Sequence, residues 1–95
     1  MTKQDNRMTE LSDKLKALSH PNRLRIIQGL FGQAQNVTAI QTQLGIPQPS
    51  VSAHLSKLRT AGLIQGERHG QIIEYSVIDS DTTDIMRSFF KAQIG

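Results

Sequence analysis

The sequence contains no cysteine among its 95 residues. This absence excludes disulfide bonds, thiolate metal sites and switches based on thiol oxidation. Tryptophan is also absent, and aromatic residues make up only 4% of the chain. A chain this short buries little surface on its own, so we expect a single domain that gains stability by forming a homodimer.

The chain also lacks a hydrophobic run of the roughly 18–20 residues that a membrane-spanning helix needs. Residues 1–20 mix basic and acidic groups and contain no apolar segment of the kind found in signal peptides. We therefore expect a cytoplasmic protein without a membrane partner.

Acidic residues are scarce in the middle of the chain. Residues 21–72 carry five basic groups and one acidic group (+4), whereas residues 1–20 carry +1 and residues 73–95 carry −2, which together give the net charge of +3. Residues 46–66 contain no Asp or Glu at all. Such a stretch suits the phosphates of a nucleic acid, although an ordinary solvated surface can have the same composition.

Apolar spacing, capping residues and glycines predict a mostly helical chain with one β-hairpin. Residues 1–8 show no period and are predicted to form a flexible N-terminus, which leaves residues 9–95 as one domain. The predicted helices cover about residues 9–19, 21–31, 37–44, 49–61 and 80–93, and the predicted strands cover 63–68 and 71–77.

The third and fourth predicted helices, joined by a tight turn at Gly45, have the form of a helix-turn-helix unit. A helix can enter the major groove, about 12 Å wide, when its leading residues are small and no carboxylates face the phosphates. Gln48 can bind an adenine edge, and Lys57 and Arg59 can reach the DNA backbone. The alternative is that the serines and glutamine at this position only cap the helix.

A predicted hairpin with a basic residue, Arg68, beside its His69-Gly70 turn follows the fourth helix directly. This arrangement is a winged helix-turn-helix, in which the hairpin contacts phosphates or a neighbouring groove. The alternative is a solvated turn in which Gly70 adopts a positive φ angle.

In these segments the chain resembles the ArsR/SmtB family of small bacterial winged-helix repressors. The matching stretches are LKALSHPNRLRIIQGL (15–30), VTAIQTQLGIPQPSVSAHLSKLRTAGLI (37–64) and RHGQIIEYSV (68–77), and the resemblance spans about residues 11–90. It implies a mostly α fold with a β-hairpin wing, in the order α-α-α-α-β-β-α. It also implies a homodimer paired through the first and last helices, which binds double-stranded DNA at an imperfect palindrome and represses transcription until an effector arrives.

The resemblance also implies which residues face DNA. Pro49 and Ala53 depart from the longer or hydroxyl-bearing residues of many members, although Ala53 can still contact a thymine methyl group. His54 either contacts DNA or is bonded inside its own fold, and the sequence leaves both open. The base-reading positions fall on Gln48, Pro49, Ser52 and Ala53, their neighbours are Ser50, His54 and Lys57, and the predicted set also includes Thr38, Arg68, His69, Gly70 and Gln71.

The first and last helices carry apolar stripes that we assign to the core and the dimer interface. The predicted interface residues are Leu11, Leu15, Ile85, Met86, Phe89 and Phe90. Arg23 and Arg25 lie beside the core face of the second helix, where we expect structural salt bridges rather than DNA contacts.

The metal sites of the family do not carry over to this sequence. The helix VTAIQTQL has neither cysteine nor histidine, and the last helix has no histidine. Asp79, Asp81 and Asp84 are explained by capping and solubility, and the three histidines show no ligand spacing. We expect no metal and no cofactor, and, because no nucleophile is paired with a base, no enzyme activity. Two alternatives stay open, namely a repressor that senses an unusual ligand or metal, and a winged-helix module that binds proteins.

Overall fold

A computed structural model of the chain describes residues 2–94, with side chains for residues 2–92. Within this range it contains five helices and one antiparallel hairpin, which confirms the predicted order α-α-α-α-β-β-α. The elements are α1 (Lys3–Leu18), α2 (Pro21–Gly32), α3 (Val37–Leu44), α4 (Gln48–Thr60), β1 (Ile64–His69), β2 (Ile72–Val77) and α5 (Asp81–Ile94).

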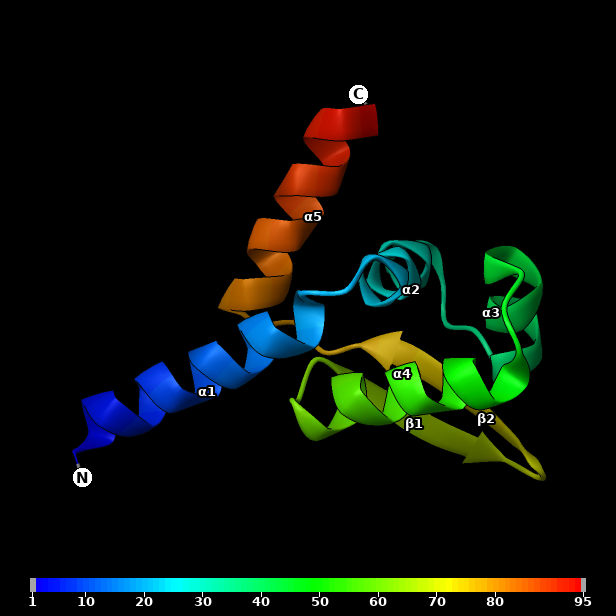
Figure 1. Ribbon diagram of the computed structural model, residues 1–95, viewed down its shortest axis with the longest axis horizontal. Helices are drawn as coiled ribbons and strands as arrows, with labels where there is room; N and C mark the ends of the chain where they lie inside the picture. The colour runs from blue at the N-terminus through cyan, green and yellow to red at the C-terminus, as the bar shows by residue number, and fades with distance from the viewer. Residues whose placement is uncertain (1, 95) are drawn as a thin grey trace.

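Helices α2, α3 and α4 and the hairpin form the body of the molecule, from which α1 and α5 extend as two arms in different directions (Figure 1). The core of the body contains fully buried side chains such as Ile27, Ile40 and Leu58. Burial of a large aliphatic side chain stabilises a fold by about 1.5–3 kcal/mol, so this cluster holds the three helices together. The arms contribute little to the core, and much of their apolar surface stays exposed.

Local capping explains where the central helices begin and end. The ring Nδ1 of His20 accepts a hydrogen bond from the backbone N–H of Asn22 (3.1 Å) and caps α2. The Asn36 side chain accepts one from the N–H of Ala39 (2.8 Å) and caps α3. Gly45 ends α3 with a φ of 66°, a conformation that glycine adopts without steric cost. These caps are among those that the sequence predicts.

The first helix begins at Lys3, six positions before the predicted start at Thr9 (9 − 3 = 6). Thr2 and Asp5 form a capping box, in which each side chain accepts a hydrogen bond from the other's backbone N–H. Two hydrogen bonds from Thr2 lower the pKa of Asp5, and the bond from the Thr2 backbone has a larger effect than the bond from its side chain. We expected residues 3–8 to be flexible, but they are helical. The polar cap starts this helix before its apolar stripe begins. Met1 and Gly95, the outer ends of the predicted segments, lie outside the described residues.

The hairpin is attached to the body along β2. Tyr75 of β2 exchanges two backbone hydrogen bonds with Gln35, in the link between α2 and α3 (2.8 and 3.0 Å). Gly66 lies opposite Tyr75, and a Cβ atom there would come within 2.9 Å of the Ile73 side chain. The strand pair is thus closely packed at Gly66, and the bonds between Gln35 and Tyr75 join it to the body. Among the helices of the described chain, none has the length and apolar character needed to cross a membrane.

Candidate nucleic-acid interface

The start of α4 has an exposed polar face that its own helix does not use. Pro47 occupies the N-cap position, and no side chain caps this helix. The capping alternative for the glutamine and serines is therefore wrong here. Val51, Leu55 and Leu58 turn into the core, which leaves the opposite face of the helix to solvent.

The predicted base-reading residues all lie on this exposed face, namely Gln48, Pro49, Ser52 and Ala53, together with Ser50 and Lys57. Among the described residues, the side chains of Gln48, Ser50 and Ser52 form no hydrogen bond within the protein. Their donors and acceptors are free to bind another molecule. Residues 46–66 carry no carboxylate that would repel phosphates, so the bound molecule can be a polyanion such as DNA.

Thr38 lies near the start of α3 and is exposed as well. Its carbonyl accepts a hydrogen bond from the Thr42 hydroxyl (3.0 Å), whereas no bond from its own side chain is found in the described part of the chain. Helix α3 packs directly against α4. Thr38 thus lies in the same helix-turn-helix unit as the predicted base-reading residues.

The strand register separates the charged side chains of the wing onto two faces. The cross-strand register sets Glu67 directly opposite Glu74, and the Nε2 atom of His69 lies 3.4 Å from Glu74 and 3.9 Å from Glu67. Because side chains alternate along a strand, Arg68 points to the opposite face from these carboxylates. The ribbon that we expected to be basic at its tip thus carries Arg68 on one face and two carboxylates on the other. The predicted wing residues Arg68, His69, Gly70 and Gln71 are all exposed.

His54 differs from the other residues predicted to face DNA, because it is half-buried. Its Nδ1 atom lies 3.3 Å from the Nη1 atom of Arg23, and its ring lies 4.5 Å from that of His20. Burial lowers the pKa of His54, and the positive charges of His20, Arg23 and Lys57 lower it further. Of the two possibilities that the sequence left open, the structure supports bonding within the fold.

Arg23 and Arg25 do not form the expected salt bridges. The Nε atom of Arg23 donates to the carbonyl of Ala17, and an Arg25 nitrogen donates to the Asn22 side chain (3.0 Å). Neither arginine has a carboxylate partner among the described residues. The sequence argument gave both a structural role but missed that their partners are neutral groups.

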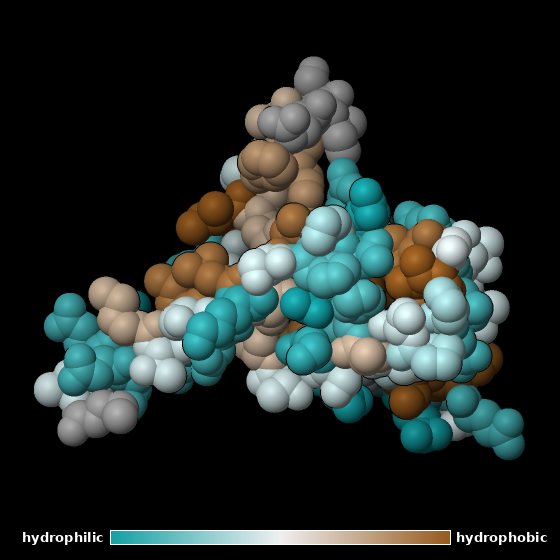
Figure 2. Space-filling model, viewed as in Figure 1, coloured by the Kyte–Doolittle hydropathy of each residue, from teal (hydrophilic) through white to brown (hydrophobic). Residues whose placement is uncertain are grey.

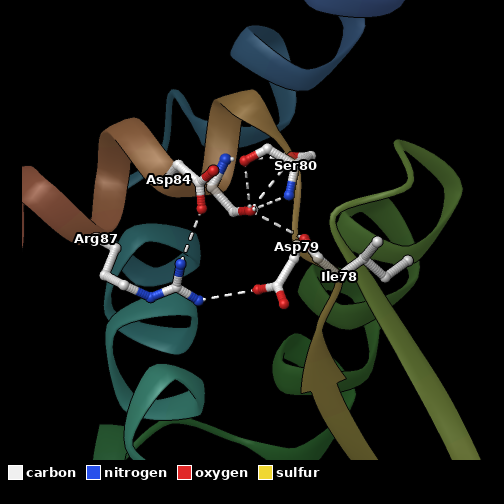
Figure 3. Close-up of polar contacts among 6 residues, drawn as sticks. Ile78, Asp79, Ser80, Asp84 and Arg87 are labelled. Atoms are coloured by element: carbon white, nitrogen blue, oxygen red, sulfur yellow. Dashed lines mark hydrogen bonds and ion pairs between the residues drawn. The ribbon is translucent and has the colours of Figure 1, made fainter.

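Two of the three aspartates near the last helix are paired with arginine (Figure 3). Arg87 lies 3.0 Å from Asp79 and 2.9 Å from Asp84, so ion pairing joins capping and solubility in explaining these carboxylates. Ser80 caps α5 by accepting a hydrogen bond from the N–H of Thr83 (3.2 Å). No cluster of three or more His, Cys, Asp or Glu side chains in the described chain is arranged to hold a metal ion.

The two arms expose apolar side chains in the angle between them (Figure 2). Leu11, Leu15, Ile85 and Phe89 have exposed fractions of 43%, 54%, 71% and 58%. Met8, which the sequence reading placed in a flexible segment, is 60% exposed on the same stripe. Its spacing of three residues before Leu11 is the signal that would have identified it.

Met86 and Phe90, also predicted at the interface, are half-buried and pack against the core of their own chain. The Phe90 ring meets that of Phe31 in α2 at 6.0 Å in an edge-on arrangement. A groove of about 900 Å³ lies between α1 and the start of α5, and its lining includes Met8, Leu11 and Ile85. Apolar residues of both arms thus border the same groove, whose lining also includes the charged residues Lys3, Arg7, Glu10, Lys14 and Asp81.

Comparison with known proteins supports the same interpretation. Residues 18–67 match the model of a helix-turn-helix domain family. The chain is 30% identical over 92 residues to the biofilm growth-associated repressor of Xylella fastidiosa, a match that covers 95% of this chain and 81% of that protein.

Two solved structures are similar as well. The transcriptional repressor PagR of Bacillus anthracis superposes with a TM-score of 0.78 at 34% identity, over 86% of this chain and 94% of PagR. A homodimeric winged helix-turn-helix DNA-binding domain from Mycobacterium bovis gives a TM-score of 0.87 over 98% of this chain and 86% of that one, but at 24% identity it bears on the fold alone.

The fold, the exposed face of α4 and these relatives define a winged helix-turn-helix transcription regulator rather than an enzyme. The chain belongs to the ArsR/SmtB family.

Proposed function

We propose that this protein is a homodimeric repressor that binds an imperfect palindromic operator in cytoplasmic DNA. The observation that carries the proposal is the start of α4, where polar side chains are exposed and unused by their own fold on a stretch without carboxylates. Gln48 and Ser52 present hydrogen-bonding groups of the kind that read base edges in the major groove. Lys57 and Arg59, exposed further along the helix, reach for phosphates.

The remaining predicted contacts surround this face. Pro49 and Ala53 provide apolar contact with the bases, and Thr38 and Ser50 reach the backbone. The wing contributes through Arg68, His69, Gly70 and Gln71, with the guanidinium of Arg68 as its main phosphate ligand. His54 is the exception, since its ring nitrogen is already engaged with Arg23.

Pairing of the α1 and α5 arms provides the dimer. The two arms expose several large apolar side chains together, whereas exposed apolar residues on a monomer are usually scattered singly. These side chains are Met8, Leu11, Leu15, Ile85 and Phe89. A two-fold axis through this surface would set two α4 helices in symmetry-related positions. Such an arrangement fits two inverted half-sites in the DNA, and it is why we propose a palindromic operator.

Neither rival function is favoured by an observation of this kind. A protein-binding recognition face would carry aromatic or leucine anchors, whereas the exposed face of α4 carries glutamine, serine and alanine. A sensor of an unusual ligand would need a site of its own, and we assign the groove between the arms to the proposed dimer interface.

A gel-shift titration tests the proposed function. The purified protein is mixed with the DNA upstream of its own gene and with a random duplex of equal length, at several salt concentrations. We expect a discrete complex with the upstream DNA, two protomers per site, and an affinity that falls as salt rises. Equal binding to both duplexes, or none to either, would overturn the proposal.

A further inference from the structure

One arginine side chain connects three helices next to the recognition face. Arg23 belongs to α2, its Nε atom donates to the carbonyl of Ala17 in the last turn of α1, and its Nη1 atom meets Nδ1 of His54 in α4 (3.3 Å). The contacts lie in a partly buried region, where solvent competes less for them. Arg23 therefore joins the end of a proposed dimer arm to the helix proposed to read DNA.

The position of His54 makes this contact matter for DNA reading. It directly follows the exposed residues Ser52 and Ala53 on α4, and it directly precedes Leu55, one of the core residues of that helix. Core packing of Val51, Leu55 and Leu58 holds α4 against the body, and the contact between Arg23 and His54 adds a polar restraint beside it. Because a hydrogen bond weakens steeply with angle, such a restraint is sensitive to the rotation of the helix, and this rotation decides how Ser52 and Ala53 face outward.

The surroundings of His54 favour its neutral form. The ring of His20, at the start of α2, lies against it at a tilt of 52°, Arg23 faces it from α2, and Lys57 lies one turn along its own helix. Of the other elements that pack on α4, α3 contains no charged residue, the first three residues of β1 are uncharged, and α1 carries the basic residue Lys16 in its last turn. Nδ1 can accept a hydrogen bond from the guanidinium only while it is unprotonated, so the proton of the neutral ring is on Nε2.

We propose that Arg23 is a positioning residue for the recognition helix, that it acts through the neutral ring of His54, and that protonation of this ring weakens the preference of the protein for its operator. The inference rests on the proposed function, because it concerns how that same site is aimed. Protonation would set an imidazolium against a guanidinium, donor facing donor, and the contact would be lost.

The direction of the pH effect follows from the environment of His54. Its pKa is lowered below the ordinary value of 6.5 by burial first and by neighbouring positive charge second. The contact is therefore intact above that ordinary value and is lost as the pH falls through the lowered pKa. General attraction to DNA changes in the opposite sense, since added protons make the protein more positive. The quantity to follow is therefore the ratio of operator affinity to random-duplex affinity.

The experiment measures this ratio by fluorescence anisotropy from about pH 8 to about pH 5, a range that spans the titration of histidine. Four proteins are compared, namely the wild type and the variants His54→Asn, Arg23→Gln and Arg25→Gln. The asparagine oxygen lies about where Nδ1 does but does not titrate. Arg25→Gln removes the same charge from the same helix at a residue that bonds only Asn22 in the described structure, so it is the matched control.

We expect the wild-type ratio to fall by about three- to tenfold in acid, the factor that loss of one hydrogen bond produces. His54→Asn should keep the high ratio at every pH, Arg23→Gln should show the low ratio at every pH, and Arg25→Gln should follow the wild type. The same pH profile in the wild type and in His54→Asn would overturn the proposal.

A second measurement separates this proposal from the proposed function. If no duplex is preferred at any pH, the proposed function fails and the DNA-reading part of the inference fails with it. The contact itself is then tested in DNA-free protein by NMR titration of the histidine rings. Arg23→Gln should raise the pKa of His54 and Arg25→Gln should not. An unchanged pKa in Arg23→Gln would overturn the contact as well, and thermal unfolding of each variant shows that it is folded.

Discussion

The guanidinium of Arg87 lies 3.0 Å from a carboxylate oxygen of Asp79, eight positions earlier in the chain. The same guanidinium lies 2.9 Å from Asp84 and 4.6 Å from the centre of the Phe31 ring in α2. One side chain thus connects α5 to the segment that follows β2 (Figure 3), and its contact with Phe31 connects the helix to the body. Because α5 is one of the two proposed dimer arms, this contact helps to set its direction relative to α4.

Replacing Arg87 by glutamine should lower the free energy of unfolding by about 1 kcal/mol, since exposed ion pairs and cation–π contacts each contribute less than or about that amount. The loss should shrink at high salt, which screens the ion pairs. Urea denaturation at two salt concentrations measures both effects. Lys91→Gln, an exposed change in the same helix, is the control, and an equal loss in the two variants would contradict this role of Arg87.

Thr83→Val should destabilise the fold by about 1–3 kcal/mol, because the buried partners of its hydroxyl would be left unsatisfied. Thr83 is fully buried, donates to the carbonyl of Ile78 (2.9 Å) and accepts from the N–H of Ser80 (2.8 Å). The neighbouring Thr82 is nearly as buried, but within the described residues its hydroxyl makes no hydrogen bond. Thermal unfolding of Thr83→Val and Thr82→Val compares the two, and the larger loss is expected at Thr83.

Phe89→Asp should convert the dimer to a monomer, because it places a charge in the apolar surface between the arms. Ile72→Asp is a matched control on the wing, since the two side chains are exposed to a similar degree, 58% and 53%. Light scattering at micromolar concentration gives the mass of each. A wild type that is monomeric there, or a Phe89→Asp variant that stays dimeric, would contradict the proposed interface.

Gln48→Ala and Arg68→Ala should have different effects on DNA binding. Loss of a base contact at Gln48 should cost about 1–3 kcal/mol on the operator and relax the sequence preference. Loss of a phosphate contact at Arg68 should weaken all duplexes alike and reduce the salt slope by about one. Binding isotherms on specific and random duplex at several salt concentrations distinguish them. Equal losses on both duplexes for Gln48→Ala would show that this residue does not read bases.

Zinc, cadmium, arsenite, peroxide and persulfide at stoichiometric levels should not release the protein from its operator. The chain has no cysteine for the thiophilic agents, and its last helix has no histidine for the metals. Anisotropy of the operator complex during titration, repeated with a chelator, measures release. Tight and chelator-reversible release by about one ion per protomer would reveal a site formed across the dimer.

Much of the architecture could be predicted because its determinants are local. His20, Asn36 and Gly45 cap helices through bonds to residues within four positions, so their roles can be read from neighbouring letters. The apolar spacing of α4 likewise predicts which face of that helix is exposed. The absence of Asp and Glu in residues 46–66 predicts that this face carries no negative charge. The start of α1 was missed because its signal, the pair Thr2 and Asp5, is polar and precedes the apolar period.

The sequence by itself determined the order of the elements, the absence of thiol chemistry and the composition of the recognition face. The tertiary structure alone decided which distant side chains meet. Arg23 and His54 are 31 positions apart in the sequence. Glu67 lies opposite Glu74 because of the strand register. Arg87 contacts Phe31 because α5 packs on α2. Such contacts depend on how helices and strands pack in three dimensions, and no spacing along the chain encodes that geometry.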